Sequence, residues 1–147
     1  QLRLLCNLLD GMVAIEGGLS GPIGPVMNEV PDRLSDIAIL CGMTLAIVHL
    51  PYPLHVGALA TIFAVLTAYI RALAGSVGAP QRFIGWMGKS QRMALVTGVC
   101  VIAAFLPRYW AEILWYVALA LLLLGCLQTC WVRSSALLTD MREGNKA

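Results

Sequence analysis

The sequence predicts an all-α integral membrane protein, a single domain over residues 1–147 with five helical segments. Of the 147 residues, 59% are hydrophobic and 12% are charged, and the mean hydropathy is +0.80. Soluble domains carry about 25% charged residues, so this composition is typical of a protein in a lipid bilayer. The second observation is a series of long uncharged segments, which predict helices because a helix satisfies its own backbone hydrogen bonds in lipid.

Two helices are predicted in the first half of the chain. Residues 2–15 read as the second half of an apolar helix, which stops at Gly17. Residues 26–50 read as a helix whose first turns are polar and whose remainder is apolar. The sequence begins at Gln1, inside an apolar run and without an initiator Met. We therefore expect an N-terminal portion to be missing.

Three further helices are predicted in the second half. A membrane-spanning helix needs about 20 predominantly apolar residues. Residues 54–70 contain no charge and are followed by Arg71, and residues 113–132 are uncharged over a full spanning length. The apolar run at 93–106 is shorter. It reaches spanning length only if its helix begins near Trp86, which is what we expect.

Lys and Arg residues gather on one side of the membrane in this arrangement. Cytoplasmic loops are enriched in these residues, so that side is predicted to be the cytoplasm. A formal net charge of +2 is too small to indicate a nucleic-acid partner. We expect a protein of the cell (inner) membrane with its functional site facing the cytoplasm. The cytoplasmic side holds Arg33, Arg71, Arg82, Lys89, Arg92, Arg133, Arg142 and Lys146, and the opposite side holds Arg108.

Polar and acidic side chains recur at helical spacing in the first two predicted helices. Charge at membrane depth is costly and commonly marks a water-accessible functional cavity. Amide and carboxylate oxygens suit Mg²⁺ or Mn²⁺, although a polar network that only locks helices together is the alternative. The residues are Asn7 and Asp10 on the first helix and Gly24, Asn28, Asp32 and Asp36, at steps of four, on the second.

Three cations are predicted on the same side of the membrane as these oxygen ligands. They are Arg71, Lys89 and Arg92, and their side chains suit phosphate oxygens. A metal site and cations at a cytoplasmic interface indicate phosphoryl chemistry on a lipid.

The spacing of the polar residues resembles the signature of the CDP-alcohol phosphotransferase family, D-x2-D-G-x2-A-R-x8-G-x3-D-x3-D. This chain reads Asn7-x2-Asp10-Gly11-x2-Ala14-Ile15-x8-Gly24-x3-Asn28-x3-Asp32, so every spacing is met. The chain departs from the signature at Asn7 and Asn28, where the family has metal-binding Asp, and at Ile15, where it has Arg. A shifted register would use Asp32 and Asp36 as the final pair.

The resemblance implies a six-helix membrane fold, of which this sequence lacks the first helix, and relatives are commonly homodimers. It implies a transferase of phospholipid biosynthesis that moves a phosphatidyl group from a CDP-linked lipid, such as CDP-diacylglycerol, to a small alcohol, with release of CMP. Asp32 would take the proton of the acceptor hydroxyl. One or two Mg²⁺ or Mn²⁺ ions would be held at Asn7, Asp10, Asn28 and Asp32, with Asp36 as an accessory, the nucleotide would lie at Gly11, Ala14 and Gly24, and the acceptor phosphate at Arg71, Lys89 and Arg92.

Two other functions compete with the transferase. Asn7 and Asn28 remove two negative charges from the implied metal site, which leaves room for a degenerate relative that binds nucleotide or lipid without catalysis. A small transporter would need polar residues along several helices, and residues 113–132 offer only Gln128 and Thr129, near one end.

Overall fold

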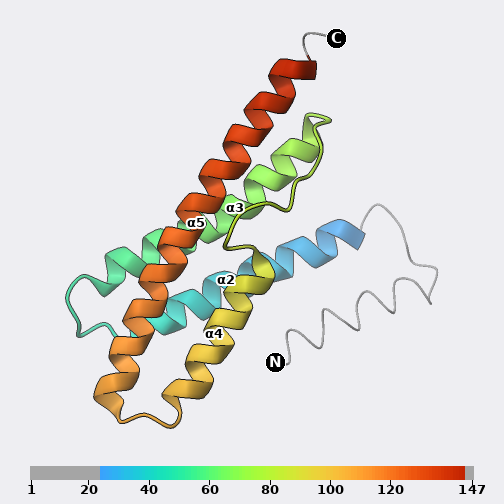
Figure 1. The fold of residues 1–147 in the computed structure, drawn as a ribbon. Coiled ribbons are helices and arrows are strands. Elements are labelled where there is room, and N and C mark those ends of the chain that lie inside the picture. Colours follow the sequence, from blue (N-terminus) through green and yellow to red (C-terminus); the bar gives the residue numbers. More distant parts are fainter. Residues whose placement is uncertain (1–23, 145–147) are drawn as a thin grey trace. The chain divides into compact units, whose positions relative to one another are not determined.

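The computed structural model describes residues 24–144, with side chains from residue 29 onward. This part of the chain is all-helical and contains no strand, which confirms the predicted class for these residues (Figure 1). The predicted helix at residues 2–15 lies outside the described residues. The helices are α2 (Gly24–Ala46), α3 (Pro53–Ser76), α4 (Lys89–Ala103) and α5 (Arg108–Gly144).

The chain divides into two compact units, Gln1–Ala38 and Ile39–Ala147. Helix α2 begins in the first unit and ends in the second, which also contains α3, α4 and α5. Each unit is described by itself below. The prediction of a single domain over the whole chain stays a prediction.

Helix α3 begins at a proline and runs well past its predicted end. Pro53 takes the first helical position, where its fixed φ suits the helix and its missing N–H is not needed. The prediction ended this helix at residue 70 because Arg71 follows, but the helix continues through Arg71 to Ser76, and the backbone N–H of Val77 binds the carbonyl of Leu73. Its 24 residues extend about 36 Å, enough to cross a hydrocarbon core of about 30 Å.

The start of α4 corrects a prediction. The helix begins at Lys89, not near Trp86, because the chain before it is bound to α5 instead. The backbone N–H of Trp86 donates to Gln128 Oε1 at 3.1 Å, and that of Met87 donates to Thr129 Oγ1 at 2.9 Å. Helix α4 therefore has only 15 residues and extends about 22 Å.

Helix α5 contains the predicted spanning segment and extends beyond both of its ends. The predicted segment covered residues 113–132, whereas the helix begins at Arg108, directly after Pro107, and continues to Gly144. Its 37 residues extend about 55 Å. In the described part of the chain, α3 and α5 are the helices long and apolar enough to cross a membrane.

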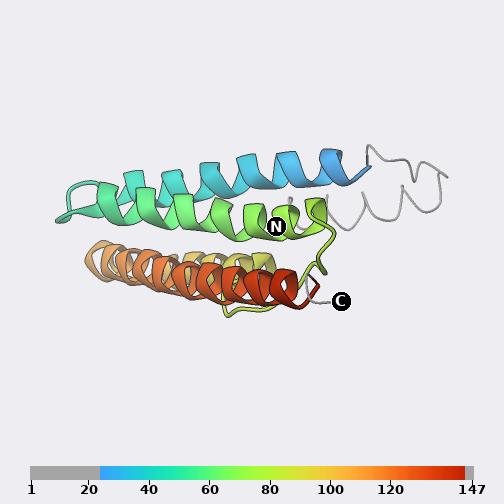
Figure 2. The same ribbon diagram turned by 90° about the horizontal axis from the view of Figure 1, so that it is seen from above.

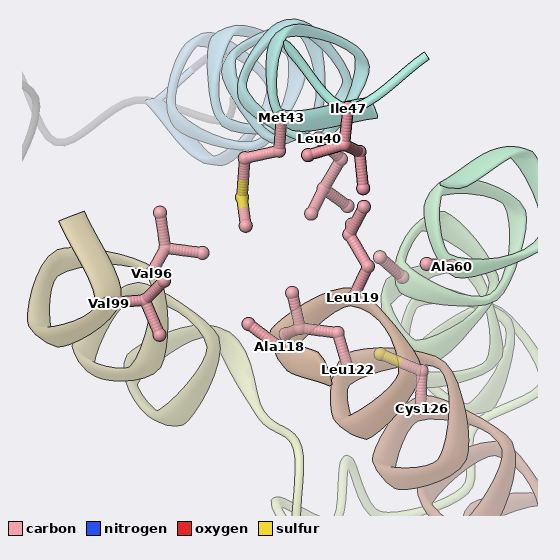
Figure 3. Close-up of a cluster of buried hydrophobic side chains, with 11 residues drawn as sticks. Leu40, Met43, Ile47, Ala60, Val96, Val99, Ala118, Leu119, Leu122 and Cys126 are labelled. Atoms are coloured by element: carbon pink, nitrogen blue, oxygen red, sulfur yellow. The ribbon is translucent and has the colours of Figure 1, made fainter. Parts of the chain in front are cut away.

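The second unit has an apolar core to which each of its helices contributes. Both α3 and α4 pack against α5, as Figures 1 and 2 show. The end of α2 lies against α3 through Gly57, where a Cβ atom would clash with the Thr44 side chain. Figure 3 shows the core side chains pointing toward one another. They are Leu40 and Met43 from α2, Ile47 just after it, Ala60 and Ala64 from α3, Val96 and Val99 from α4, and Ala118, Leu119, Leu122 and Cys126 from α5.

Candidate functional site

Two carboxylates predicted to be functional are buried on α2, within the first unit. The exposed fraction is 3% for Asp32 and 1% for Asp36. They are one helical turn apart and therefore share a face of the helix. Gly24 begins α2, and the backbone of Asn28 lies in the same helix, so the second half of the signature is helical as predicted. The predicted site residues Asn7, Asp10, Gly11 and Ala14, together with Ile15 and the side chain of Asn28, lie outside the described residues.

Arg33 stands between these carboxylates. Its Nη1 lies 3.5 Å from Asp36 Oδ2, and its Nη2 lies 3.9 Å from Asp32 Oδ2 and 3.7 Å from Glu29 Oε2. Arg33 was predicted only as a cation of the cytoplasmic side, not as a neighbour of these carboxylates. The i,i+3 and i,i+4 spacing to Asp36 and Glu29 was the signal that could have found it. Arg33 thus offsets part of the negative charge of these carboxylates.

The chemistry of these carboxylates fits a divalent metal, since Mg²⁺ and Mn²⁺ prefer oxygen ligands. Within residues 24–144, however, no group of three or more His, Cys, Asp or Glu side chains is gathered closely enough to hold an ion. A metal at Asp32 and Asp36 would need further ligands from Asn7, Asp10 or Asn28.

Arg92, a predicted phosphate ligand, is a buried cation of the second unit, with 2% of its surface exposed. Its Nη1 donates to Thr67 Oγ1 at 3.0 Å and to the carbonyl of Met87 at 3.1 Å. The Thr67 hydroxyl in turn donates to the carbonyl of Ala64 at 2.7 Å. The guanidinium of Arg92 is therefore fixed by α3 and by the chain before α4.

Arg133, on α5, is a second buried guanidinium and was not among the predicted site residues. Its Nε donates to the carbonyl of Ile84 at 2.9 Å, and its Nη1 donates to the carbonyl of Thr67 at 2.6 Å. Thr67 thus accepts one hydrogen bond from Arg133 and another from Arg92. Arg133 also lies within electrostatic range of Arg92 and Arg71. Its apolar sequence surroundings gave no sign of these partners, which are 49 and 66 residues away along the chain.

The predicted cation Arg71 lies at the same end of the second unit. Its guanidinium carbon is 5.2 Å from the centre of the Phe83 ring. Arg71 and Arg133 line a small pocket together with Arg82 and Asp140, and its volume of about 10 Å³ has room for about one water molecule. The structure thus brings Arg71 and Arg92 together with Arg133. Lys89 begins α4, three residues before Arg92.

The segment between α3 and α4 is fastened along α5 by polar side chains. Besides the contacts of Gln128, Thr129 and Arg133, Asp140 accepts two hydrogen bonds from Arg82, from Nη2 at 2.7 Å and from Nε at 3.0 Å. The hydrogen bonds and charge of Asp140 raise the pKa of Arg82 above its usual value. Gln128 and Thr129, which looked isolated in the sequence, therefore position the chain that leads into Lys89 and Arg92. We call residues 82–87 the strapped segment.

Gly85 is required by the close approach of the strapped segment to α5. Its φ is +110°, and a Cβ atom would lie 2.5 Å from Thr129 Cγ2. Only glycine adopts such a backbone without strain. Glycine at position 85 therefore lets the strapped segment reach the Thr129 hydroxyl.

Comparison with known proteins identifies a relative in the inner membrane of a bacterium. The chain is 32% identical over 133 residues to the inner membrane protein YnbA of Escherichia coli (strain K12), an alignment that covers 88% of this chain and 64% of that protein. The chain thus spans less than two thirds of the length of this relative. No family model matches the chain, and no solved structure matches it. Two of the described helices are long enough to cross a bilayer, and the relative is an inner membrane protein. The chain is therefore an integral inner membrane protein.

Proposed function

We propose that the protein is a metal-dependent transferase that moves a phosphatidyl group from a CDP-linked lipid, such as CDP-diacylglycerol, to a small alcohol. The proposal rests on Arg71, Arg92 and Arg133, which lie together at one end of a membrane-embedded unit. The segment that precedes this unit in the chain has the spacing of a CDP-alcohol phosphotransferase signature. The proposal includes the six-helix fold, the homodimer and the cytoplasmic orientation of the site.

In the proposed reaction, the hydroxyl oxygen of the acceptor attacks the phosphorus that carries the lipid. The bond from this phosphorus to the oxygen bridging the two phosphates breaks, and the electron pair leaves with CMP. Asp32 takes the hydroxyl proton, and its burial keeps water away from that proton. One or two Mg²⁺ or Mn²⁺ ions at Asn7, Asp10, Asn28 and Asp32, with Asp36 as accessory, would offset charge on the diphosphate. Gly11, Ala14 and Gly24 would lie against the nucleotide.

The cations of the second unit would bind an anionic group of the acceptor or donor. Arg133 supports this role because both of its hydrogen bonds within the described residues go to carbonyl oxygens, which leave its charge unneutralised. Arg92 is held by Thr67 and Met87, so it loses little side-chain entropy when it binds. We assign the phosphate to Arg71, Lys89 and Arg92, and we add Arg133 to that set.

A protein that binds nucleotide or lipid without turnover is the second candidate, and one observation favours it. Arg33 lies beside Glu29, Asp32 and Asp36, and a neighbouring cation lowers the affinity of carboxylates for a metal ion by repulsion. Together with Asn7 and Asn28, it reduces the negative charge available to two dications. This candidate predicts binding of CDP-diacylglycerol and no release of CMP.

The two candidates are separated by an assay for CMP. Full-length protein in lipid vesicles would be incubated with CDP-diacylglycerol, Mn²⁺ or Mg²⁺ and a panel of alcohols, including glycerol phosphate and inositol phosphate. The transferase releases CMP with at least one acceptor, and a chelator of divalent ions stops the release. Binding of CDP-diacylglycerol without CMP release for every acceptor would establish the second candidate instead.

A further inference from the structure

The second unit contains a pocket at the end of α4 and α5 that is opposite to Arg92 and Arg133. It lies where α4 ends and α5 begins, and it has a volume of about 360 Å³, within the range of about 300–1,000 Å³ for small-molecule sites. Small side chains make the space, among them Ala103 and Ala104 at the end of α4 and Ala111 on α5. We call this the turn pocket.

One side of the turn pocket carries a pair of opposite charges. Arg108 and Glu112 both line it. Arg108 Nε donates to Glu112 Oε1 at 2.8 Å, and the other carboxylate oxygen lies 2.9 Å from His49 Nε2. The Arg108 side chain is 88% exposed, and its Nε alone bonds within the described residues, so both terminal nitrogens remain available. Each Glu112 oxygen can accept a second hydrogen bond.

The surroundings place the turn pocket at the membrane surface. Phe105, Tyr109 and Trp110, in and just after the turn between α4 and α5, are all exposed. Exposed Trp and Tyr residues near the end of a spanning helix are typical of the level of the lipid headgroups. A ligand in the turn pocket would have its polar part beside Arg108 and Glu112 and its apolar part against the alanines.

We propose that the turn pocket binds one zwitterionic phospholipid from the bilayer. The lipid phosphate pairs with the free terminal nitrogens of Arg108, its ammonium group pairs with Glu112, and one acyl chain lies along Ala103 and Ala104. An anionic lipid would make the same contact with Arg108, but it has no ammonium group to pair with Glu112. This site is separate from the proposed transferase site.

The headgroup assignment is tested on the wild-type protein by native mass spectrometry. Protein in detergent would be titrated with 1-palmitoyl-2-oleoyl phosphatidylethanolamine or with the matching phosphatidylglycerol, and the retained lipids would be counted. We expect one phosphatidylethanolamine to be retained about tenfold more tightly, a difference of about 1.4 kcal/mol. Equal retention, or tighter binding of phosphatidylglycerol, would overturn the proposal.

Two variants and a control test the location. Glu112→Gln should abolish the preference between the two lipids. Ala104→Leu should remove the retained lipid by filling the turn pocket, whereas Ala72→Leu, at an exposed position on α3 away from it, should not. If Ala104→Leu retains the lipid, or if it changes the oligomeric state instead, the pocket does not hold a lipid as proposed. The wild-type titration decides the matter if a variant fails to fold.

Discussion

Thr67 joins the two buried guanidinium groups of Arg92 and Arg133, and replacing it with valine tests whether its hydroxyl holds Arg92 in place. Valine has the shape of threonine but lacks the hydroxyl. Thr67→Val therefore removes the oxygen that accepts from Arg92 at 3.0 Å and keeps the backbone carbonyl that accepts from Arg133 at 2.6 Å. Hydrogen bonds to charged groups contribute about 1.5–3 kcal/mol, so we expect the free energy of unfolding to fall by this amount.

Thr61 supplies a matched control on the same helix. Its hydroxyl donates to the carbonyl of Gly57 at 2.8 Å, as that of Thr67 donates to Ala64, but no arginine binds Thr61 within the described residues. Thr61→Val should cost less than about 1 kcal/mol, since only a neutral local hydrogen bond is lost. Both variants would be unfolded in mixed micelles by increasing the fraction of denaturing detergent, with circular dichroism as the readout.

A double-mutant cycle with Arg92→Gln isolates the interaction itself. We expect Thr67→Val to be much less costly in the Arg92→Gln background, with a coupling free energy of at least about 1 kcal/mol. If Thr67→Val and Thr61→Val cost the same, or if the effects of Thr67→Val and Arg92→Gln simply add, the Thr67 hydroxyl does not hold Arg92.

Three further predictions follow from the neighbouring contacts. Gly85→Ala should lower the free energy of unfolding by about 1–3 kcal/mol, because alanine is strained at a φ of +110°; an unchanged unfolding curve would contradict the contact with α5. Thr129→Val removes the acceptor of the Met87 N–H and should speed hydrogen exchange at Met87 about tenfold, whereas Thr129→Ser, which keeps the hydroxyl, should not. Arg33→Gln removes the cation beside Asp32 and Asp36 and should tighten Mn²⁺ binding, measured by electron paramagnetic resonance, by about tenfold; weaker binding would show that Arg33 supports the metal site.

The helices were predictable to the extent that local sequence determines them. Uncharged runs located α3 and α5, and Pro53 marked the start of α3 to within one residue. The C-terminal end of α3 and both ends of α5 were misplaced because charged residues were taken as helix boundaries, whereas Arg71, Glu112 and Arg133 lie within their helices. Long cationic side chains can be accommodated within a spanning helix when neighbouring carbonyls accept their hydrogen bonds.

The candidate site was predictable in part. The spacing of Asp32 and Asp36 placed them on one face of a helix, and both are buried. The strapped segment could not be read from the sequence, because its bonds join residues 42 or more positions apart. Arg133 was missed for the same reason. Side chains that act through a neighbouring helix leave no periodic signal in their own segment.

Release of CMP by the Asp32→Asn variant is the sharpest test of the proposed transferase and of the role of Asp32. Wild-type protein, Asp32→Asn and Glu29→Gln would be assayed together in vesicles with CDP-diacylglycerol, Mn²⁺ and the acceptor panel. Glu29 lies on the same helix with 42% of its side chain exposed, so Glu29→Gln makes the same chemical change at a carboxylate to which the proposal gives no catalytic or metal-binding role. We expect wild type and Glu29→Gln to release CMP, and Asp32→Asn to release it at least about a hundredfold more slowly. Equal release by all three proteins would contradict the assignment of Asp32, and no release by wild type would contradict the transferase itself.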